Sequence, residues 1–282
     1  MQQRAFYMTS EPAPQSCAVF SSPHSGADYP EDFLNGSNLT PQQLRSSEDA
    51  FVDRFVGDTL GAPVLCARLP RAYVDLNRAP DELDPALIKG ASGAPTNPRI
   101  AAGLGVIPRV VADGRAIRVG KMPQAEAVAR LNRYYHPYHN ALREVIAAQK
   151  RRFGTCTLFD LHSMPRSVLP NGSFGGKVEV ILGDRYGTSC DPWLGAAVAA
   201  IFKEAGFKVA RNAPFAGGFI TRHYGVPRNG VNALQIEIDR SLYMDEKRIE
   251  PRADFEAFQE LMRGIVTKLA ALPPCVQNLA AE

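Results

Sequence analysis

One segment constrains the fold of this chain more than any other: residues 155–161, TCTLFDL, are almost continuously apolar. A strand of this kind is typical of a sheet that is buried on both faces. It lies between the longest helical pattern, residues 124–149, and a further strand-like run at 178–182. Strands that alternate with helices in this way predict one α/β domain, 1–282, built around a mostly parallel sheet. The other expected strands are 17–21, 63–67, 72–76, 207–210 and 233–238, and the other expected helices are 47–60, 193–205 and 255–272.

The composition argues against several classes of protein. The chain has 282 residues, of which 45% are hydrophobic, and a formal net charge of +3. No run of Lys and Arg is long enough to predict binding to nucleic acid or to an anionic membrane. No stretch approaches the ~18 apolar residues of a membrane span, and the N-terminus lacks the apolar core of a signal peptide. Five cysteines without a CxxC pair predict buried free thiols and a cytoplasmic location, and the pattern leaves the oligomeric state open.

Three expected strands carry polar groups that could form a metal site. His24 follows the first strand, His162 comes two residues after Asp160 at the end of the strand 155–161, and Glu237 lies in the last. The carboxyl ends of parallel strands meet at one edge of a sheet, where ligands bind. Imidazole and carboxylate groups supply the ligands and the base of a hydrolytic zinc site. A lone His is more often a hydrogen-bonded loop residue, but Asp160 could orient a liganding imidazole at His162.

Glu237 has a simpler alternative role, and two further histidines are not expected to bind metal. Strand alternation places Glu237 on a polar face with residues 235 and 239, and that face either lines a pocket or is merely solvated. His136 and His139 lie on the helix that Pro137 interrupts. No strand end is involved there, so a packing role is expected for both imidazoles.

Two further segments predict loops that bind a substrate. Residues 71–78, RAYVDLNR, end in Asn77 and Arg78, and a guanidinium group can bind a carboxylate through two parallel hydrogen bonds. Residues 217–225, GGFITRHYG, place Arg222, His223 and Tyr224 on a glycine-rich frame, which permits a close approach to a ligand. A surface arginine and a turn with exposed side chains are the respective alternatives.

The chain resembles the N-formylglutamate amidohydrolase family in six motifs that occur in the expected order between about residues 17 and 246. The motifs are SSPHSGADYP, EDAFVDRF, PRAYVDLNR, FDLHSMP, GGFITRHYG and ALQIEIDRSLYMDE. The family belongs to the wider group of zinc carboxypeptidases and aspartoacylases. The resemblance implies a single α/β domain with a mixed central sheet flanked by helices. It also implies hydrolysis of N-formyl-L-glutamate to formate and L-glutamate.

The resemblance implies roles for the metal-binding residues. His24 and His162 would bind Zn²⁺, and Glu237 would be the general base. Carboxypeptidases and aspartoacylases use a Glu three residues after the first His, and that position is Ala27 here. The acidic segment Glu48–Asp49 is expected to supply the ligand in place of that Glu. The favoured third ligand is Asp49, with Glu48 and Asp53 as alternatives.

The resemblance also implies that arginines bind the small anionic substrate. Asn77 and Arg78 would hold a carboxylate, and Arg222 is expected to stabilise the oxyanion of the tetrahedral intermediate. Arg71, Arg109 or Arg222 would hold a second carboxylate, and His223 and Tyr224 would belong to the substrate loop.

Two other functions remain open at this stage. One is hydrolysis of a bulkier N-acyl amino acid or a small peptide, with the Pro- and Gly-rich residues 78–121 setting the size of the pocket. The other is a non-catalytic domain that binds a metal or a ligand, which the presence of Glu237 disfavours.

Overall fold

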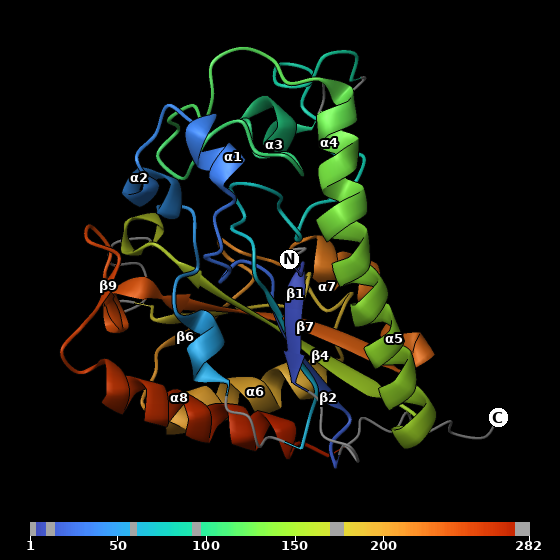
Figure 1. Ribbon diagram of the computed structural model, residues 1–282. Coiled ribbons are helices and arrows are strands. Elements are labelled where there is room, and N and C mark those ends of the chain that lie inside the picture. Colours follow the sequence, from blue (N-terminus) through green and yellow to red (C-terminus); the bar gives the residue numbers. More distant parts are fainter. Residues whose placement is uncertain (1–3, 10–14, 57–60, 92–96, 170–177, 274–282) are drawn as a thin grey trace.

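A seven-stranded mixed sheet in the order β1-β3-β2-β4-β7-β5-β6 runs through the centre of the molecule (Figure 1). The structure is a computed structural model and describes residues 4–9, 15–56, 61–91, 97–169 and 178–273. The strands are β1 (Phe6–Thr9), β2 (Ala18–Ser22), β3 (Val64–Ala67), β4 (Cys156–Met164), β5 (Val180–Gly183), β6 (Val209–Arg211) and β7 (Val231–Asp239). A separate two-stranded sheet pairs β8 (Met244–Asp245) with β9 (Glu250–Pro251).

Strand direction explains why functional groups gather at one edge. The strands β3, β2, β4 and β7 are parallel neighbours, whereas β1 runs antiparallel to β3 and β5 runs antiparallel to β7. The expected mixed sheet is therefore confirmed. Because β2, β4 and β7 point the same way, their carboxyl ends lie side by side, and the register places His162 opposite Glu237.

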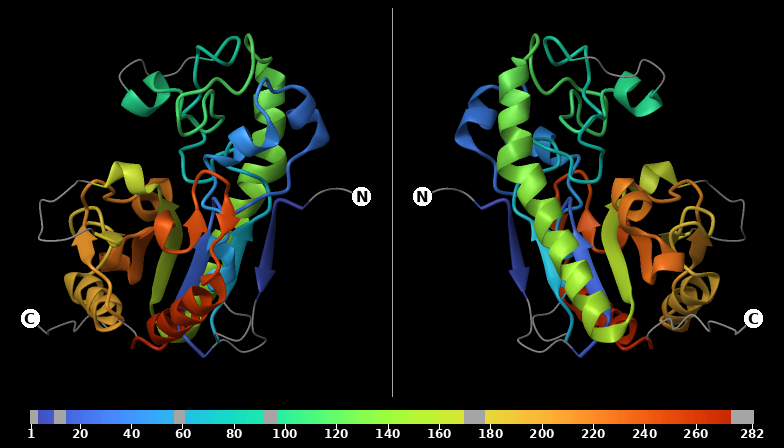
Figure 2. Two further views of the ribbon diagram at one scale, coloured as in Figure 1. Left: turned by 90° about the vertical axis from the view of Figure 1, so that its left-hand side faces the viewer. Right: turned by 90° about the vertical axis from the view of Figure 1, so that its right-hand side faces the viewer.

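Helices cover both faces of the sheet (Figures 1 and 2). On one face, α5 (His136–Phe153) packs Leu142 into a cluster with Val19 of β2 and Leu158 of β4. On the other face, α6 (Pro192–Glu204) and α8 (Phe255–Ala270) share a second cluster with the apolar side chains of β2, β4 and β7. Both faces of the central strands are thus buried, as the apolar run at 155–161 predicts.

The expected long helix is present, but it contains a π-helical turn. It runs from α4 (Gln124–Arg130) through η2 (Leu131–Tyr135) into α5. Pro137 has no N–H, and its ring would clash with the carbonyl four residues earlier in a regular α-helix. The wider π turn immediately before it accommodates the proline. The same turn brings the Tyr135 hydroxyl to the Arg78 carbonyl, to which it donates a hydrogen bond of 2.8 Å.

Two expected elements are wrong. Of the expected helix 47–60, the structure forms only the 3-10 turn η1 (Val52–Phe55), and residues 57–60 lie outside the described part of the chain. Phe51 has a φ of 67°, which interrupts helical geometry, so the apolar spacing reflects one buried turn. The expected strand 72–76 is a series of turns, because Tyr73 N–H bonds to Pro70 O and Asp75 N–H bonds to Val106 O instead of to a strand.

The other expected elements are found with shifted ends, and β1 is an edge strand that the sequence did not predict. Short elements outside the main layers complete the described chain: α1 (Glu31–Asn35), α2 (Pro41–Arg45), α3 (Pro98–Ala101), α7 (Phe219–Tyr224), η3 (Arg166–Val168), η4 (Pro227–Asn229) and η5 (Arg240–Leu242). Apart from α3, the described part of 78–121 has neither helix nor strand, as expected.

The thiols at positions 17, 66, 156 and 190 are buried and form no disulfide, and Cys275 lies outside the described residues. Among the helices described, none has the length and apolarity to cross a membrane.

Candidate metal centre and substrate pocket

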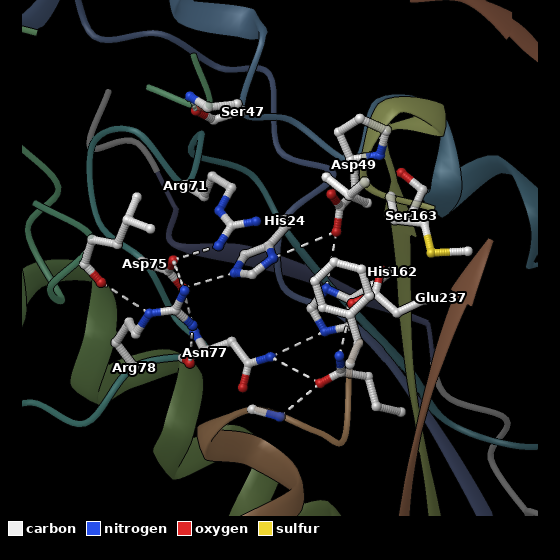
Figure 3. A pocket seen from close by; sticks show the side chains of 18 of the residues that line it. His24, Ser47, Asp49, Arg71, Asp75, Asn77, Arg78, His162, Ser163 and Glu237 are labelled. Carbon is white, nitrogen blue, oxygen red and sulfur yellow. Dashed lines mark hydrogen bonds and ion pairs between the residues drawn. The ribbon is translucent and has the colours of Figure 1, made fainter. Parts of the chain in front are cut away.

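Two imidazoles and a carboxylate converge at the carboxyl ends of β2 and β4 (Figure 3). Oδ2 of Asp49 lies 2.9 Å from Nδ1 of His162 and 3.4 Å from Nδ1 of His24. One ligand atom from each residue lies within 4.8 Å of the others, and all three side chains are buried. The backbone holds Asp49 in place, because its N–H donates to the His24 carbonyl at 3.0 Å.

Further carboxylates orient both imidazoles. Nε2 of His24 lies 2.7 Å from Oδ1 of Asp75, and Nε2 of His162 lies 2.8 Å from Oδ2 of Asp160. A carboxylate accepts a hydrogen bond, so each Nε2 can donate its proton to that carboxylate, and the Nδ1 of each ring then faces the centre. This pairing of carboxylate and histidine is typical of metal sites.

One buried nitrogen supports a metal at this position. Nδ1 of His24 has no hydrogen-bond partner among the described residues, although the side chain is only 2% exposed. A buried polar atom without a partner costs free energy unless a ligand satisfies it. The two imidazole nitrogens and the carboxylate oxygen face one another, and this set of donors fits a divalent cation.

Of the three acidic residues considered as third ligand, only Asp49 meets the imidazoles. Glu48 accepts hydrogen bonds from the Tyr29 hydroxyl at 2.5 Å and from Arg45 at 3.1 Å. Asp53 accepts from the Tyr7 hydroxyl at 2.9 Å.

The other contacts of Asp49 keep it charged. Its Oδ1 accepts a hydrogen bond of 2.8 Å from Arg240. Burial would raise the pKa of Asp49, but His162 and His24 outweigh that effect and hold the pKa well below its usual range. The group nearest the two Nδ1 atoms is therefore a carboxylate, which a cation prefers.

Glu237 faces the cavity from β7. Its neighbours on the strand, Ile236 and Ile238, point into the core on the other face, so the expected alternation is confirmed. Gln235 donates to Oε1 of Glu237 at 2.7 Å. Burial raises the pKa of Glu237 to about 7, with His162 opposing the shift and Asp49 adding to it. The polar face of this strand lines a pocket of about 350 Å³ and is not a solvated surface.

Four arginines line the same cavity: Arg71, Arg78, Arg99 and Arg240. Arg71 donates to Oδ2 of Asp75 at 2.7 Å. Arg78 donates from Nε to the Leu104 carbonyl at 3.0 Å and from Nη1 to the Asn77 carbonyl at 2.9 Å. A small anion that entered the cavity would therefore meet several guanidinium groups close to the imidazoles.

Asn77 lines the cavity and also joins two of the segments singled out in the sequence. Its Oδ1 accepts from the Ile220 N–H at 2.8 Å, and its Nδ2 lies 3.2 Å from Nε2 of His162. A Cβ at Gly218 would lie 2.4 Å from Nδ2 of Asn77. The glycine of the GGF motif thus permits the close approach of α7 to Asn77.

The structure does not bring the other expected substrate and catalytic residues to the cavity. Helical spacing in α7 turns Tyr224 inward and leaves Arg222 and His223 exposed. The Tyr224 hydroxyl lies 2.9 Å from Nδ1 of His139, which confirms the packing role of that histidine. Arg109 donates to Asp84 at 2.8 Å and supports the 78–121 segment.

Three groups at the site were not expected from the sequence. Asp75 lies in the segment 72–76, which was expected to form a strand, two residues before Asn77. Arg240 directly follows the last strand in the motif IEIDR, and Arg99 lies in a segment without periodicity. None of the three has a spacing that distinguishes it from a surface residue.

The comparison with known sequences identifies the family. The sequence model of the N-formylglutamate amidohydrolase family matches residues 16–244 of this chain. The chain belongs to this family. The resemblance inferred from the six motifs is thereby confirmed.

Individual members of the family show the same relationship. An N-formylglutamate deformylase of Pseudomonas aeruginosa is 37% identical over 219 residues, which cover 76% of this chain and 77% of that protein. An N-formylglutamate deformylase of Pseudomonas putida is 37% identical over 191 residues, 66% of each chain. The crystal structure of N-formylglutamate amidohydrolase from Ralstonia eutropha JMP134 is similar with a TM-score of 0.88 and 35% identity, covering 95% of this chain and 98% of that chain.

Proposed function

We propose that this protein hydrolyses the amide bond of N-formyl-L-glutamate and releases formate and L-glutamate. The observation that carries the proposal is the buried group of His24, Asp49 and His162, which lies in one cavity with Glu237 and four arginines. The deformylases that are 37% identical to this chain support the choice of substrate.

We further propose that His24, Asp49 and His162 hold Zn²⁺. The donors are two Nδ1 atoms and a carboxylate oxygen, and nitrogen and oxygen ligands of this kind suit zinc. Zinc bound there would lower the pKa of a water molecule and polarise the scissile carbonyl. Asp75 and Asp160 would keep the two rings in the tautomer that binding requires.

Glu237 is the proposed general base. The carboxylate would take a proton from the attacking water and pass it to the nitrogen of the leaving glutamate. A pKa raised to about 7 by burial suits both steps, since the group can accept and return a proton near neutral pH. The hydrogen bond from Gln235 leaves one carboxylate oxygen for this task.

Arg71 replaces Arg222 as the proposed donor to the oxyanion. Arg71 lines the cavity, and Asp75, which also orients His24, fixes its guanidinium group. Its remaining N–H groups can stabilise charge that develops on the carbonyl oxygen. Arg78 is the proposed anchor of the α-carboxylate, and Asn77 positions that anchor by connecting it to α7.

The size of the cavity favours a compact substrate over the alternative of a bulkier N-acyl amino acid or peptide. Ligand pockets span roughly 300–1,000 Å³, and about 350 Å³ is near the lower end. The other alternative, a non-catalytic binding domain, does not account for a carboxylate of raised pKa beside the three candidate ligands.

The test is to measure amino acid release by the zinc-loaded protein from formyl-, acetyl- and longer-acyl-L-glutamate. The proposal predicts that kcat/KM is highest for the formyl compound and falls as the acyl chain lengthens. No release of glutamate from N-formylglutamate would contradict it, as would a kcat/KM that rises with acyl length.

A further inference from the structure

The four arginines of the cavity are unequally paired with carboxylates. Arg71 and Arg240 each donate to a buried carboxylate, at 2.7 and 2.8 Å. Arg78 donates only to backbone carbonyls, and its Nη2 lies 3.8 Å from the nearest oxygen of Asp75. In the part of the chain that the structure describes, the Arg99 side chain has neither an ion pair nor a hydrogen bond. Arg99 is therefore available to an anion, and Arg78 makes only the longer ion pair with Asp75.

Arg78 and Arg99 lie at different depths. Arg78 is 12% exposed and lies beside Asp75, close to the imidazoles (Figure 3). Arg99 is exposed and belongs to α3, which stands above the carboxyl end of β4 (Figure 2). Asn97 fixes the start of α3, since its Oδ1 accepts from the Arg99 N–H at 3.0 Å. Both side chains line one cavity, and burial, Arg71 and Arg99 lower the pKa of Arg78 while Asp75 opposes that shift, so the guanidinium groups of Arg78 and Arg99 repel each other.

We propose that Arg99 determines specificity by binding a second carboxylate, the one on the side chain of the amino acid, while Arg78 binds the α-carboxylate. The inference rests on the proposed function, and it assigns to Arg99 the discrimination between acidic and neutral side chains of the substrate. A dianion offers one carboxylate to Arg99 and one to Arg78, and it relieves the repulsion between the two guanidinium groups. The side-chain carboxylate of glutamate is farther from the scissile amide than the α-carboxylate, so its anchor has to lie farther out, as Arg99 does.

Neighbouring cations outside the cavity provide a control. Burial, Arg222 and Arg99 together lower the pKa of Arg185, which places all three guanidinium groups in one basic region. Neither Arg185 nor Arg222 lines the cavity. Their charge raises the local concentration of anions of any kind, whereas Arg99 distinguishes one side chain from another.

The experiment compares N-formyl-L-glutamate with N-formyl-L-glutamine, which has the same shape and lacks the second charge. Wild type, Arg99→Ala and the matched control Arg222→Ala are assayed for kcat/KM on both compounds. Binding of the products L-glutamate and L-glutamine is measured in parallel. Arg99→Ala should lower kcat/KM for the glutamate compound about tenfold, the usual order for an exposed hydrogen bond between charged groups, and leave the glutamine compound within about twofold. Arg222→Ala should keep the wild-type preference.

The outcomes separate the inference from the proposed function. Equal losses on both compounds, or no loss with Arg99→Ala, would overturn the role of Arg99 while the deformylase activity stands. If the wild type hydrolyses neither compound, the proposed function fails, and the binding of L-glutamate and L-glutamine then tests the role of Arg99. That role stands if the wild type binds glutamate more tightly than glutamine and Arg99→Ala abolishes the preference. It falls if Arg99→Ala keeps the preference, or if the wild type has no preference.

Discussion

Replacement of Glu237 by glutamine probes the proposed chemistry with little change of shape. The side chain is 6% exposed, and Gln235 already donates to its Oε1 at 2.7 Å, a contact that a glutamine oxygen can retain. The variant should therefore keep its fold and its metal. The exchange removes the only proton acceptor proposed for the reaction.

The expected loss of kcat is large, because the other carboxylates that line the cavity cannot substitute for Glu237. Asp49 accepts from Arg240 at 2.8 Å and Asp75 accepts from Arg71 at 2.7 Å, so both are already neutralised. Loss of a general base costs about 10²–10⁴ in rate, which corresponds to roughly 3–5 kcal/mol in activation free energy.

Single-turnover hydrolysis of N-formylglutamate by the zinc-loaded variant is the assay. Asp239→Asn is the matched control, since Asp239 lies on the same face of β7 but outside the cavity, where it pairs with Arg166 at 2.6 Å. The control should stay within a few-fold of wild type. A Glu237→Gln rate within tenfold of wild type would refute the assignment of the base.

Two further predictions concern the buried groups behind the site. Asp75→Asn should weaken metal affinity about 10–100-fold in chelator competition, because an amide group would meet Arg71 or His24 with the wrong polarity; unchanged affinity would exclude this orienting role. Burial lowers the pKa of His139 to about 3, whereas the unfolded residue titrates near 6.5. The unfolded chain therefore binds more protons below pH 6.5, and this residue should reduce the free energy of unfolding by roughly 2.5 kcal/mol on acidification from pH 7 to about pH 4.5. Denaturant titrations should show a smaller loss for His139→Gln, and an equal loss would contradict the neutral assignment.

The strand patterns predicted which two imidazoles and which carboxylate of β7 meet at the site, because the direction of the strands brings these residues together. His24, His162 and Glu237 follow or belong to three parallel neighbouring strands, so their convergence follows from the order of the sheet. The fold class was predictable for the same reason, since the strands alternate with helices. The antiparallel placement of β5 was implied only by the family resemblance, because the pattern of one strand does not report the direction of its neighbour.

The arginines could not be assigned from the sequence, because their roles depend on helical phase and on loop packing. Arg222 belongs to a short helix whose inward face is set by Tyr224 and its contact with His139, and that phase leaves Arg222 outside. Arg99 and Arg240 reach the cavity from segments without a repeating pattern. The expected helix 47–60 failed in a related way: buried side chains at Val52 and Phe55 reproduce helical spacing over a single turn.

The most direct test of the account is the metal content of the purified protein, measured for wild type and for His162→Ala. Nδ1 of His162 is one of three proposed ligand atoms, and Asp160 holds the ring that presents it. Wild type should contain one zinc ion per chain, and His162→Ala should lose both zinc and deformylase activity. His136→Ala is the control and should keep both. Stoichiometric zinc in His162→Ala, or full activity of wild type after removal of all metal, would contradict the central claim.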